Sequence, residues 1–226
     1  MIRVFIGYDH VEEIAFHTCV SSIIRHATQP VAITPVSLQS LGGLMTRPRD
    51  PRQSNEFSFS RFLVPHLCEY QGWAIFMDCD IVLTADIAKL WDLRNPEYAI
   101  QVCQHDYVPR DSVKYLGNAQ LAYPRKNWSS VMLFNNRRCK ALTPNYVNTA
   151  SGLALHRFQW LRDEAIGALP LEWNWLVGEY PENSGAAAYH FTVGGPWFRE
   201  YEGTDHASIW FEQKEYAFNS CQREDK

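Results

Sequence analysis

The sequence predicts an α/β fold in which a mixed, mainly parallel sheet is flanked by helices. The first observation is an alternation from the N-terminus: an apolar strand at residues 3–7, a helix at 11–25 and a second strand at 31–38. The second is a continuously apolar segment at residues 73–77, which is typical of a buried strand. With 226 residues the chain fits one domain, residues 1–226, with enough mass for a substantial core.

The first helix has an apolar face that includes Ile14, Cys19 and Ile23, whereas Pro35 indicates an edge or irregular position for the second strand. The other elements are expected in this order: an exposed loop at 40–56, a helix at 57–70, the buried strand at 73–77, a short helix at 87–91, a strand at 98–104, a long functional loop at 105–127, a strand at 131–134, helices at 156–167 and 173–178, a strand at 187–191 and a tight turn at 194–197.

Composition narrows the class of protein. Apolar residues make up 46% of the chain and it contains eight Trp, which indicates a packed globular protein. A net charge of −4 gives no electrostatic footprint for nucleic acid. The six cysteines form no Cys-x-x-Cys pair, and neither a signal peptide nor an apolar run of bilayer-spanning length is found. We therefore expect a cytoplasmic protein with reduced thiols and no transmembrane segment, and peripheral membrane contact remains open.

The sequence Asp78-Cys79-Asp80 directly follows the buried strand at residues 73–77, and the chain becomes apolar again straight afterwards. Two carboxylates at the mouth of a buried strand are costly unless a cation or ligand meets them. Carboxylate oxygens suit a divalent ion that also takes phosphate oxygens. A polar turn or a helix cap is the alternative interpretation of the pair.

A second polar segment, Gly7-Tyr8-Asp9, also follows a strand. Ligands of open α/β sheets sit at the carboxyl ends of the strands, so this segment and the acid pair are expected to converge on one crevice. Asp9 can accept a hydrogen bond from a base or ribose, or it can cap the following helix, and the two roles are compatible.

Five ordered pieces of the chain resemble a glycosyltransferase of the GT-A fold, within the glycogenin and lipopolysaccharide galactosyltransferase group, family 8. The resemblance runs from residue 2 to about residue 198. The pieces are the strand and turn at residues 4–9, the helical segment at 60–63 with Arg61, the acid pair at 78–80, the segment at 128–135, and the closing segment at 169–174 with His190 and residues 194–197. This resemblance implies a GT-A, Rossmann-like sheet flanked by helices.

The resemblance also implies a role for individual residues. The expected donor-binding residues are Ile6, Gly7, Tyr8, Asp9, Arg61, Cys79, Ser129, Ser130, Gly194 and Gly195; the expected metal ligands are Asp78, Asp80 and His190; the expected catalytic residues are Asp78, Asp80, His156 and Gln159. Three departures from the family pattern stand out. Gly195 occupies the place of a family Lys, and His156 to Gln159 is the nearest stretch to a family Asp-Gln-Asp. Trp128-Ser129-Ser130 replaces the family Asn-Ala-Gly beside the donor sugar.

The implied reaction is transfer of a sugar, with retention of configuration, from a UDP-sugar donor to a hydroxyl of a saccharide or glycan acceptor. The mixed oxygen and nitrogen ligand set favours Mn²⁺, with Mg²⁺ or Co²⁺ able to substitute. The sequence places no carboxylate nucleophile beneath the sugar, which favours a front-face transfer over a double displacement. The alternatives are a sugar nucleotidyltransferase, whose Gly-rich signature after the first strand is missing here, and a non-catalytic nucleotide-sugar or carbohydrate binder.

Overall fold

The main sheet has six strands in the order β2-β1-β3-β8-β5-β9. A computed structural model describes residues 1–50, 53–106, 113–114, 116, 118–119, 124–182 and 185–219. The strands are β1 (Ile2–Gly7), β2 (Val31–Val36), β3 (Trp73–Met77), β5 (Ile100–Cys103), β8 (Val131–Asn135) and β9 (Ile166–Leu169). Only β8 runs antiparallel to its neighbours in this sheet of the described residues. The expected mixed, mainly parallel sheet is therefore confirmed.

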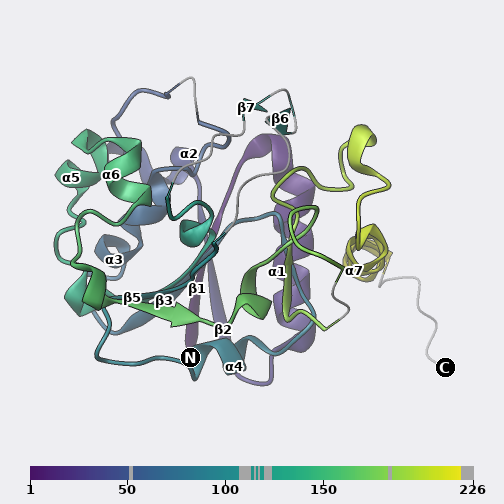
Figure 1. The fold of residues 1–226 in the computed structure, drawn as a ribbon, viewed down its shortest axis with the longest axis horizontal. Helices are drawn as coiled ribbons and strands as arrows, with labels where there is room; N and C mark the ends of the chain where they lie inside the picture. The colour runs from purple at the N-terminus through teal and green to yellow at the C-terminus, as the bar shows by residue number, and fades with distance from the viewer. Residues whose placement is uncertain are drawn as a thin grey trace.

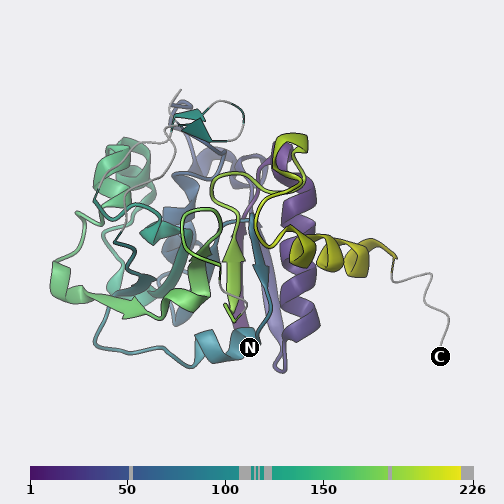
Figure 2. The same ribbon diagram turned by 45° about the vertical axis from the view of Figure 1, so that its right-hand side comes forward.

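Helices cover both faces of this sheet (Figure 1). One face carries α1 (Glu13–His26), with α7 (Ala207–Asn219) lying outside it, as the turned view in Figure 2 also shows. The opposite face carries α3 (Val64–Leu67), α5 (Pro144–Thr149) and α6 (Gly152–His156). Two further short helices are α2 (Leu38–Leu41) and α4 (Ile87–Trp91). None of the helices in the described ranges has the length and apolar character that a membrane crossing requires.

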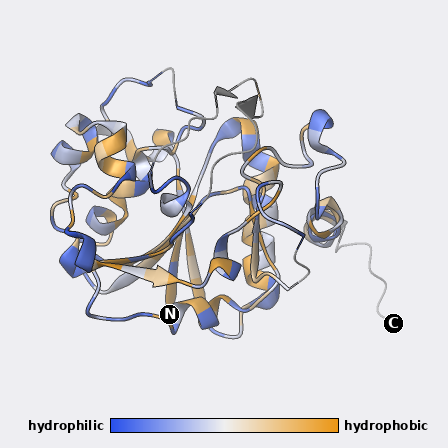
Figure 3. Cartoon of the chain, in the orientation of Figure 1, coloured by the Kyte–Doolittle hydropathy of each residue, from blue (hydrophilic) through white to orange (hydrophobic). Residues whose placement is uncertain are grey.

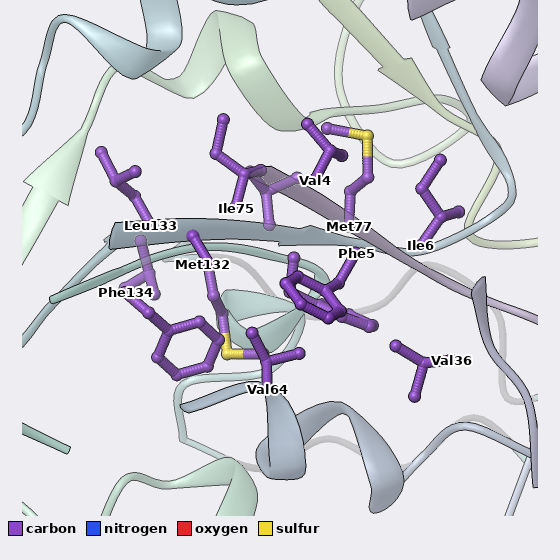
Figure 4. Packing of buried hydrophobic residues seen from close by; sticks show 14 of the residues in the cluster. Val4, Phe5, Ile6, Val36, Val64, Ile75, Met77, Met132, Leu133 and Phe134 are labelled. Carbon is purple, nitrogen blue, oxygen red and sulfur yellow. The ribbon is translucent and has the colours of Figure 1, made fainter. Parts of the chain in front are cut away.

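Alternation along the strands fills the core on both sides of the sheet. The strands are apolar over most of their length (Figure 3), and successive side chains of a strand point to opposite faces. Ile75 and Met77 point to the α1 side, where the Cys19 Sγ lies 3.9 Å from the Met77 Sδ. Met132 points to the other side, beside Val64 of α3 (Figure 4). Each fully buried side chain of this size stabilises the fold by about 1.5–3 kcal/mol.

A second sheet has the order β10-β11-β4, formed by β10 (Trp175–Leu176), β11 (Ala188–His190) and β4 (Ile81–Leu83). The antiparallel pairing of β11 with β4 sets His190 opposite Ile81. Because β4 begins immediately after Asp80, this register brings the end of β11 to the acid pair. A small two-stranded sheet pairs β6 (Val113–Lys114) with β7 (Asn118–Ala119). It lies within the predicted loop at 105–127, of which residues 107–112, 115, 117 and 120–123 lie outside the described residues.

Three helix predictions were wrong in part. The helix expected at 156–167 ends at His156, and the chain then leads to the strand β9. Phe158 adopts a left-handed backbone with φ 55°, which is incompatible with a continuing helix. In this conformation its ring is fully buried in the core. The segment at 173–178 is instead the end of a 3-10 turn at Leu171–Asn174 followed by β10, and the segment at 57–70 is a 3-10 turn at Ser60–Leu63 followed by α3.

Candidate functional site

The acid pair joins the two sheets. Asp78 follows β3, and its backbone N–H donates to the Ser130 carbonyl at 2.9 Å, which extends the pairing of β3 with β8. The Asp80 carbonyl accepts from the Phe191 N–H at 2.9 Å, which extends the pairing of β4 with β11. Cys79 between them is 1% exposed and belongs to the core, and burial raises the pKa of its thiol well above the usual range.

His190 completes a cluster with the two aspartates. One ligand atom each from Asp78, Asp80 and His190 lies within 4.8 Å of the others. The His190 Nε2 is 3.3 Å from the Asp80 Oδ2, and all three side chains are buried or nearly so. Two carboxylates and one imidazole nitrogen form a donor set that fits a divalent transition-metal ion. The three predicted metal ligands are thus brought together, and their residues fit such an ion.

Arg61 supplies the positive charge next to this cluster. Its Nη1 lies 2.7 Å from the Asp78 Oδ1 and also donates to the Ser129 carbonyl at 2.9 Å. The side chain is 4% exposed, and its guanidinium carbon lies 5.2 Å and 5.1 Å from the ring centroids of Phe57 and Phe76. A buried charge needs such a partner, since removal of either member leaves the other uncompensated. Arg61 therefore fixes the orientation of Asp78.

Two of the predicted catalytic residues, His156 and Gln159, lie at or just after the end of α6 and outside the cluster of Asp78, Asp80 and His190. The Ser129 Oγ is 2.8 Å from the His156 Nδ1, and the His156 ring packs edge-on against Phe62 at 5.3 Å between centroids. Burial, followed by the charges of Arg61 and Arg47, lowers the pKa of His156 to about 3, so the imidazole is neutral at physiological pH. His156 thus contacts Ser129, whose backbone carbonyl accepts a hydrogen bond from Arg61. The Gln159 side chain is exposed. The catalytic roles of His156 and Gln159 stay predictions.

The Phe57 ring packs against Gly7 at the end of β1 and also against the Arg61 guanidinium. An added Cβ on Gly7 would lie 2.2 Å from the Phe57 ring, so this glycine is required by close packing. The Asp9 carboxylate accepts backbone N–H groups of Val11 and Glu56, each at 3.0 Å, which confirms its capping role. Ile6 is fully buried, whereas Tyr8 is partly exposed. Donor contacts at this end of the sheet stay predictions.

The turn after β11 is tightly packed. The Gly194 N–H donates to the Phe191 carbonyl at 3.1 Å. An added Cβ on Gly195 would lie 1.9 Å from the Trp197 ring, so Trp197 covers the position at which the family carries Lys. A larger residue at 195 requires Trp197 to move. The predicted donor-binding role of the two glycines remains a prediction.

Sequence reasoning missed the residues behind His190. The His190 Nδ1 lies 2.8 Å from the Asn174 Oδ1, and the Asn174 Nδ2 lies 2.9 Å from the His105 Nε2. The His105 Nδ1 in turn lies 2.8 Å from the Tyr180 Oη. Burial lowers the pKa of His105 to about 3 and raises that of Tyr180 to about 12. Asn174 belongs to the closing segment noted in the sequence, but no pattern there marks its amide as a partner of His190.

Comparison with known proteins places this site in a family. The model of the family described as "Glycosyl transferase family 8" matches residues 9–184. "Protein CDI" of Arabidopsis thaliana is 46% identical over 222 residues, which cover 94% of this chain and 86% of that protein. Both matches include the acid pair and the Arg61 segment.

Solved structures show the same fold at low identity. The galactosyltransferase LgtC, in complex with donor and acceptor sugar analogs, matches with a TM-score of 0.63 and 10% identity over 94% of this chain and 95% of LgtC. GlyE of Streptococcus pneumoniae TIGR4 matches with a TM-score of 0.61 and 16% identity, and the bifunctional WbbM with 0.64 and 16%. This chain spans 60% of the GlyE chain and 51% of the WbbM chain. The fold is GT-A, and the chain belongs to glycosyl transferase family 8 and is a glycosyltransferase.

Proposed function

We propose that this glycosyltransferase moves a sugar from a UDP-sugar to a hydroxyl of a saccharide or glycan acceptor, with retention of configuration and with Mn²⁺ held by Asp78, Asp80 and His190. The convergence of these three ligands from two sheets carries the proposal. The site lies at the carboxyl end of β3, and the carboxyl ends of strands are where α/β proteins bind ligands. We further propose that the chain works as one domain, residues 1–226.

The residues around the cluster would share the work of binding the donor. When bound, the divalent ion supplies Lewis-acid stabilisation of the charge that develops on the diphosphate. Asp78 and Asp80 contribute oxygen ligands and His190 contributes its Nε2. Arg61 holds the Asp78 carboxylate in place through their 2.7 Å contact and keeps a positive charge beside the site. Mg²⁺ suits the two carboxylates, but the imidazole nitrogen favours Mn²⁺.

The proposed transfer takes place on one face of the sugar. The bond from the anomeric carbon to the diphosphate oxygen breaks, and a bond to the acceptor oxygen forms on the same side. The acceptor proton passes to the departing phosphate oxygen. A double displacement needs a free carboxylate beneath the sugar, whereas Asp78 is paired with Arg61 and Asp80 lies against His190. A trapped covalent adduct between the sugar and a carboxylate would contradict the front-face route.

Calorimetric titration of UDP tests the donor site. We expect wild-type protein to bind UDP with Mn²⁺ and to lose this binding in excess chelator. Asp80→Ala should abolish the metal-dependent binding because it removes one of the three ligands. Asp92→Ala is the matched control, since Asp92 is an exposed carboxylate beyond α4. Metal-independent binding by wild type, or unchanged binding by Asp80→Ala, would contradict the proposal.

Turnover separates the proposed activity from its alternatives. Release of UDP from a UDP-sugar, dependent on an added glycan, is the expected result. Pyrophosphate formed from a nucleoside triphosphate and a sugar phosphate would instead indicate a nucleotidyltransferase, and donor binding without turnover on any acceptor would indicate a binding protein. The five cysteines in the described ranges are free and buried, as expected for reduced thiols, and a cytoplasmic location stays a prediction.

A further inference from the structure

His190 has two ring nitrogens in competition for one proton. The Nε2 faces the Asp80 carboxylate at 3.3 Å, and the Nδ1 faces the Asn174 Oδ1 at 2.8 Å. A neutral imidazole carries its proton on only one of them. A proton on Nε2 would satisfy Asp80 but would block that nitrogen as a ligand, whereas a proton on Nδ1 leaves the Nε2 lone pair free for a cation. The side-chain partner of Nδ1 therefore decides whether His190 can ligate.

The orientation of the Asn174 amide is fixed by a group that cannot change its role. Its Nδ2 lies 3.2 Å from the Asn127 backbone carbonyl, which is an acceptor only. The end of the amide that faces Asn127 must therefore be the NH₂ group, and the end that faces His190 must be the oxygen. Because that oxygen is also only an acceptor, the short contact with His190 requires a proton on Nδ1. Asn174 is fully buried, so water does not compete for these bonds.

His105 takes the second hydrogen of the same NH₂ group. The His105 Nε2, 2.9 Å from the Asn174 Nδ2, must then be an acceptor, and the His105 Nδ1 donates to the Tyr180 Oη at 2.8 Å. His105 is 5% exposed and is neutral at physiological pH. The Trp128 Nε1 donates to the backbone carbonyl of His105 at 2.8 Å, which adds a further anchor for this residue. The three side-chain hydrogen bonds from His190 to Asn174, His105 and Tyr180 are all donated in the direction away from His190.

We propose that Asn174 is a positioning residue that keeps the proton of His190 on Nδ1 and presents Nε2 to the cation, with the Asn127 carbonyl and His105 holding its amide in that orientation. The proposal rests on the proposed function, because it takes His190 to be a metal ligand. Partners of this kind behind a metal-bound histidine typically contribute about 10–100-fold to metal affinity.

The test measures the tautomer of His190 in metal-free protein and then the affinity for Mn²⁺. Long-range ¹H–¹⁵N NMR of the imidazole rings, assigned with a His190→Gln variant, distinguishes the two tautomers. Asn174→Leu removes both ends of the amide, whereas Asn174→Asp keeps an acceptor oxygen against Nδ1. Asn136→Leu is the matched control: Asn136 is also fully buried, bonds the Gln71 carbonyl, and directly follows the end of β8 that pairs with the start of β3, far from the acid pair.

We expect the Nδ1–H tautomer in wild type, in Asn136→Leu and in Asn174→Asp, and a shift to Nε2–H in Asn174→Leu. Mn²⁺ affinity should fall about 10–100-fold in Asn174→Leu and recover in large part in Asn174→Asp. An Nε2–H tautomer in wild type, or unchanged Mn²⁺ affinity in Asn174→Leu, would overturn the proposal while leaving the metal site intact. A wild-type protein that shows Nδ1–H but binds no Mn²⁺ would overturn it through failure of the proposed function itself.

Discussion

Two histidines with lowered pKa values make the stability of this protein depend on pH. Burial lowers the pKa of both His105 and His156 to about 3, from an ordinary value of 6.5. Between these values the unfolded chain binds protons that the folded chain refuses. The free energy of unfolding is therefore highest, with respect to these two groups, above pH 6.5, and it falls progressively as the pH drops from 6.5 towards 3.

We predict that each of these histidines lowers the free energy of unfolding by about 2 kcal/mol between pH 7 and pH 5. Urea unfolding at the two pH values measures the change. His156→Gln, which keeps a polar partner for Ser129, should lose about 2 kcal/mol less than wild type over this interval. His17→Gln, at a 51% exposed side chain, is the control and should follow wild type. Parallel pH profiles for wild type and His156→Gln would contradict the burial of a neutral imidazole.

The sequence identified the ligand cluster but not its support. Asp78 and Asp80 were recognisable because acids rarely follow a buried strand without a reason, and His190 because its segment resembles the family. Asn174 and His105 could not be found in this way. Their role depends on tertiary structure, because the turn Leu171–Asn174 meets the end of β5 behind β11. The contact between the two side chains joins residues 69 positions apart in the sequence.

At the scale of elements, strands were predicted better than helices. The strands β1, β3, β5, β8 and β11 all fall within two residues of their expected bounds, and β3 matches them, because continuous apolar runs of this length indicate a buried strand. The prediction of a helix at 156–167 was wrong because apolar residues of this segment, such as Phe158, are buried in the core although they lie in turns. Long-range pairing with β5 then makes a strand of Ile166–Leu169, which no local pattern reveals.

Gly7, at the end of β1, packs directly against the Phe57 ring, which leaves no room for a side chain at this position. Gly7→Ala would place a Cβ 2.2 Å from the Phe57 ring, which is 1% exposed and cannot move without disturbing the core. We predict a loss of about 1–3 kcal/mol in the free energy of unfolding. Weaker Mn²⁺-dependent UDP binding should accompany it, because Arg61 packs on the displaced ring. Urea unfolding and calorimetry measure the two effects.

Gly43→Ala is the matched control for this substitution, since an added Cβ there meets nothing within 4 Å. It should leave both the stability and UDP binding close to wild type. Equal effects of the two substitutions would show that backbone freedom, and not contact with Phe57, explains the loss at Gly7.

At the scale of the whole molecule, a second core supports the site from the C-terminal side. Its buried members are Val82, Val177, Ala186, Tyr189, Phe191 and Trp210. They come from β4, from the residue after β10, from β11 and the residues near its two ends, and from α7, which lies beyond the segment matched by the family model. The same helix is tied to α1, where Arg25 contacts Glu212 and Gln213, each at 3.1 Å. α7 therefore packs against β4 and against α1, and it shares a core with the two residues that flank His190.

Trp210 is the buried side chain that α7 contributes to this second core. It is 2% exposed, and its ring lies 5.4 Å from that of Trp197, which in turn covers Gly195. Trp210→Ala should lower the free energy of unfolding by about 3–5 kcal/mol, through lost burial and the cavity left behind. It should also weaken Mn²⁺-dependent UDP binding, because β11 and the following turn lose their backing.

Phe218→Ala on the same helix is the control, since that ring is 50% exposed. A surface substitution of this kind changes stability by about 0.5 kcal/mol or less. Urea unfolding and calorimetric titration of both variants separate general loss of the helix from loss of the Trp210 contact. If Trp210→Ala unfolds more easily yet binds UDP as wild type does at low temperature, α7 stabilises the fold without positioning His190. If it loses both, the segment beyond the family match is part of the apparatus that holds the site.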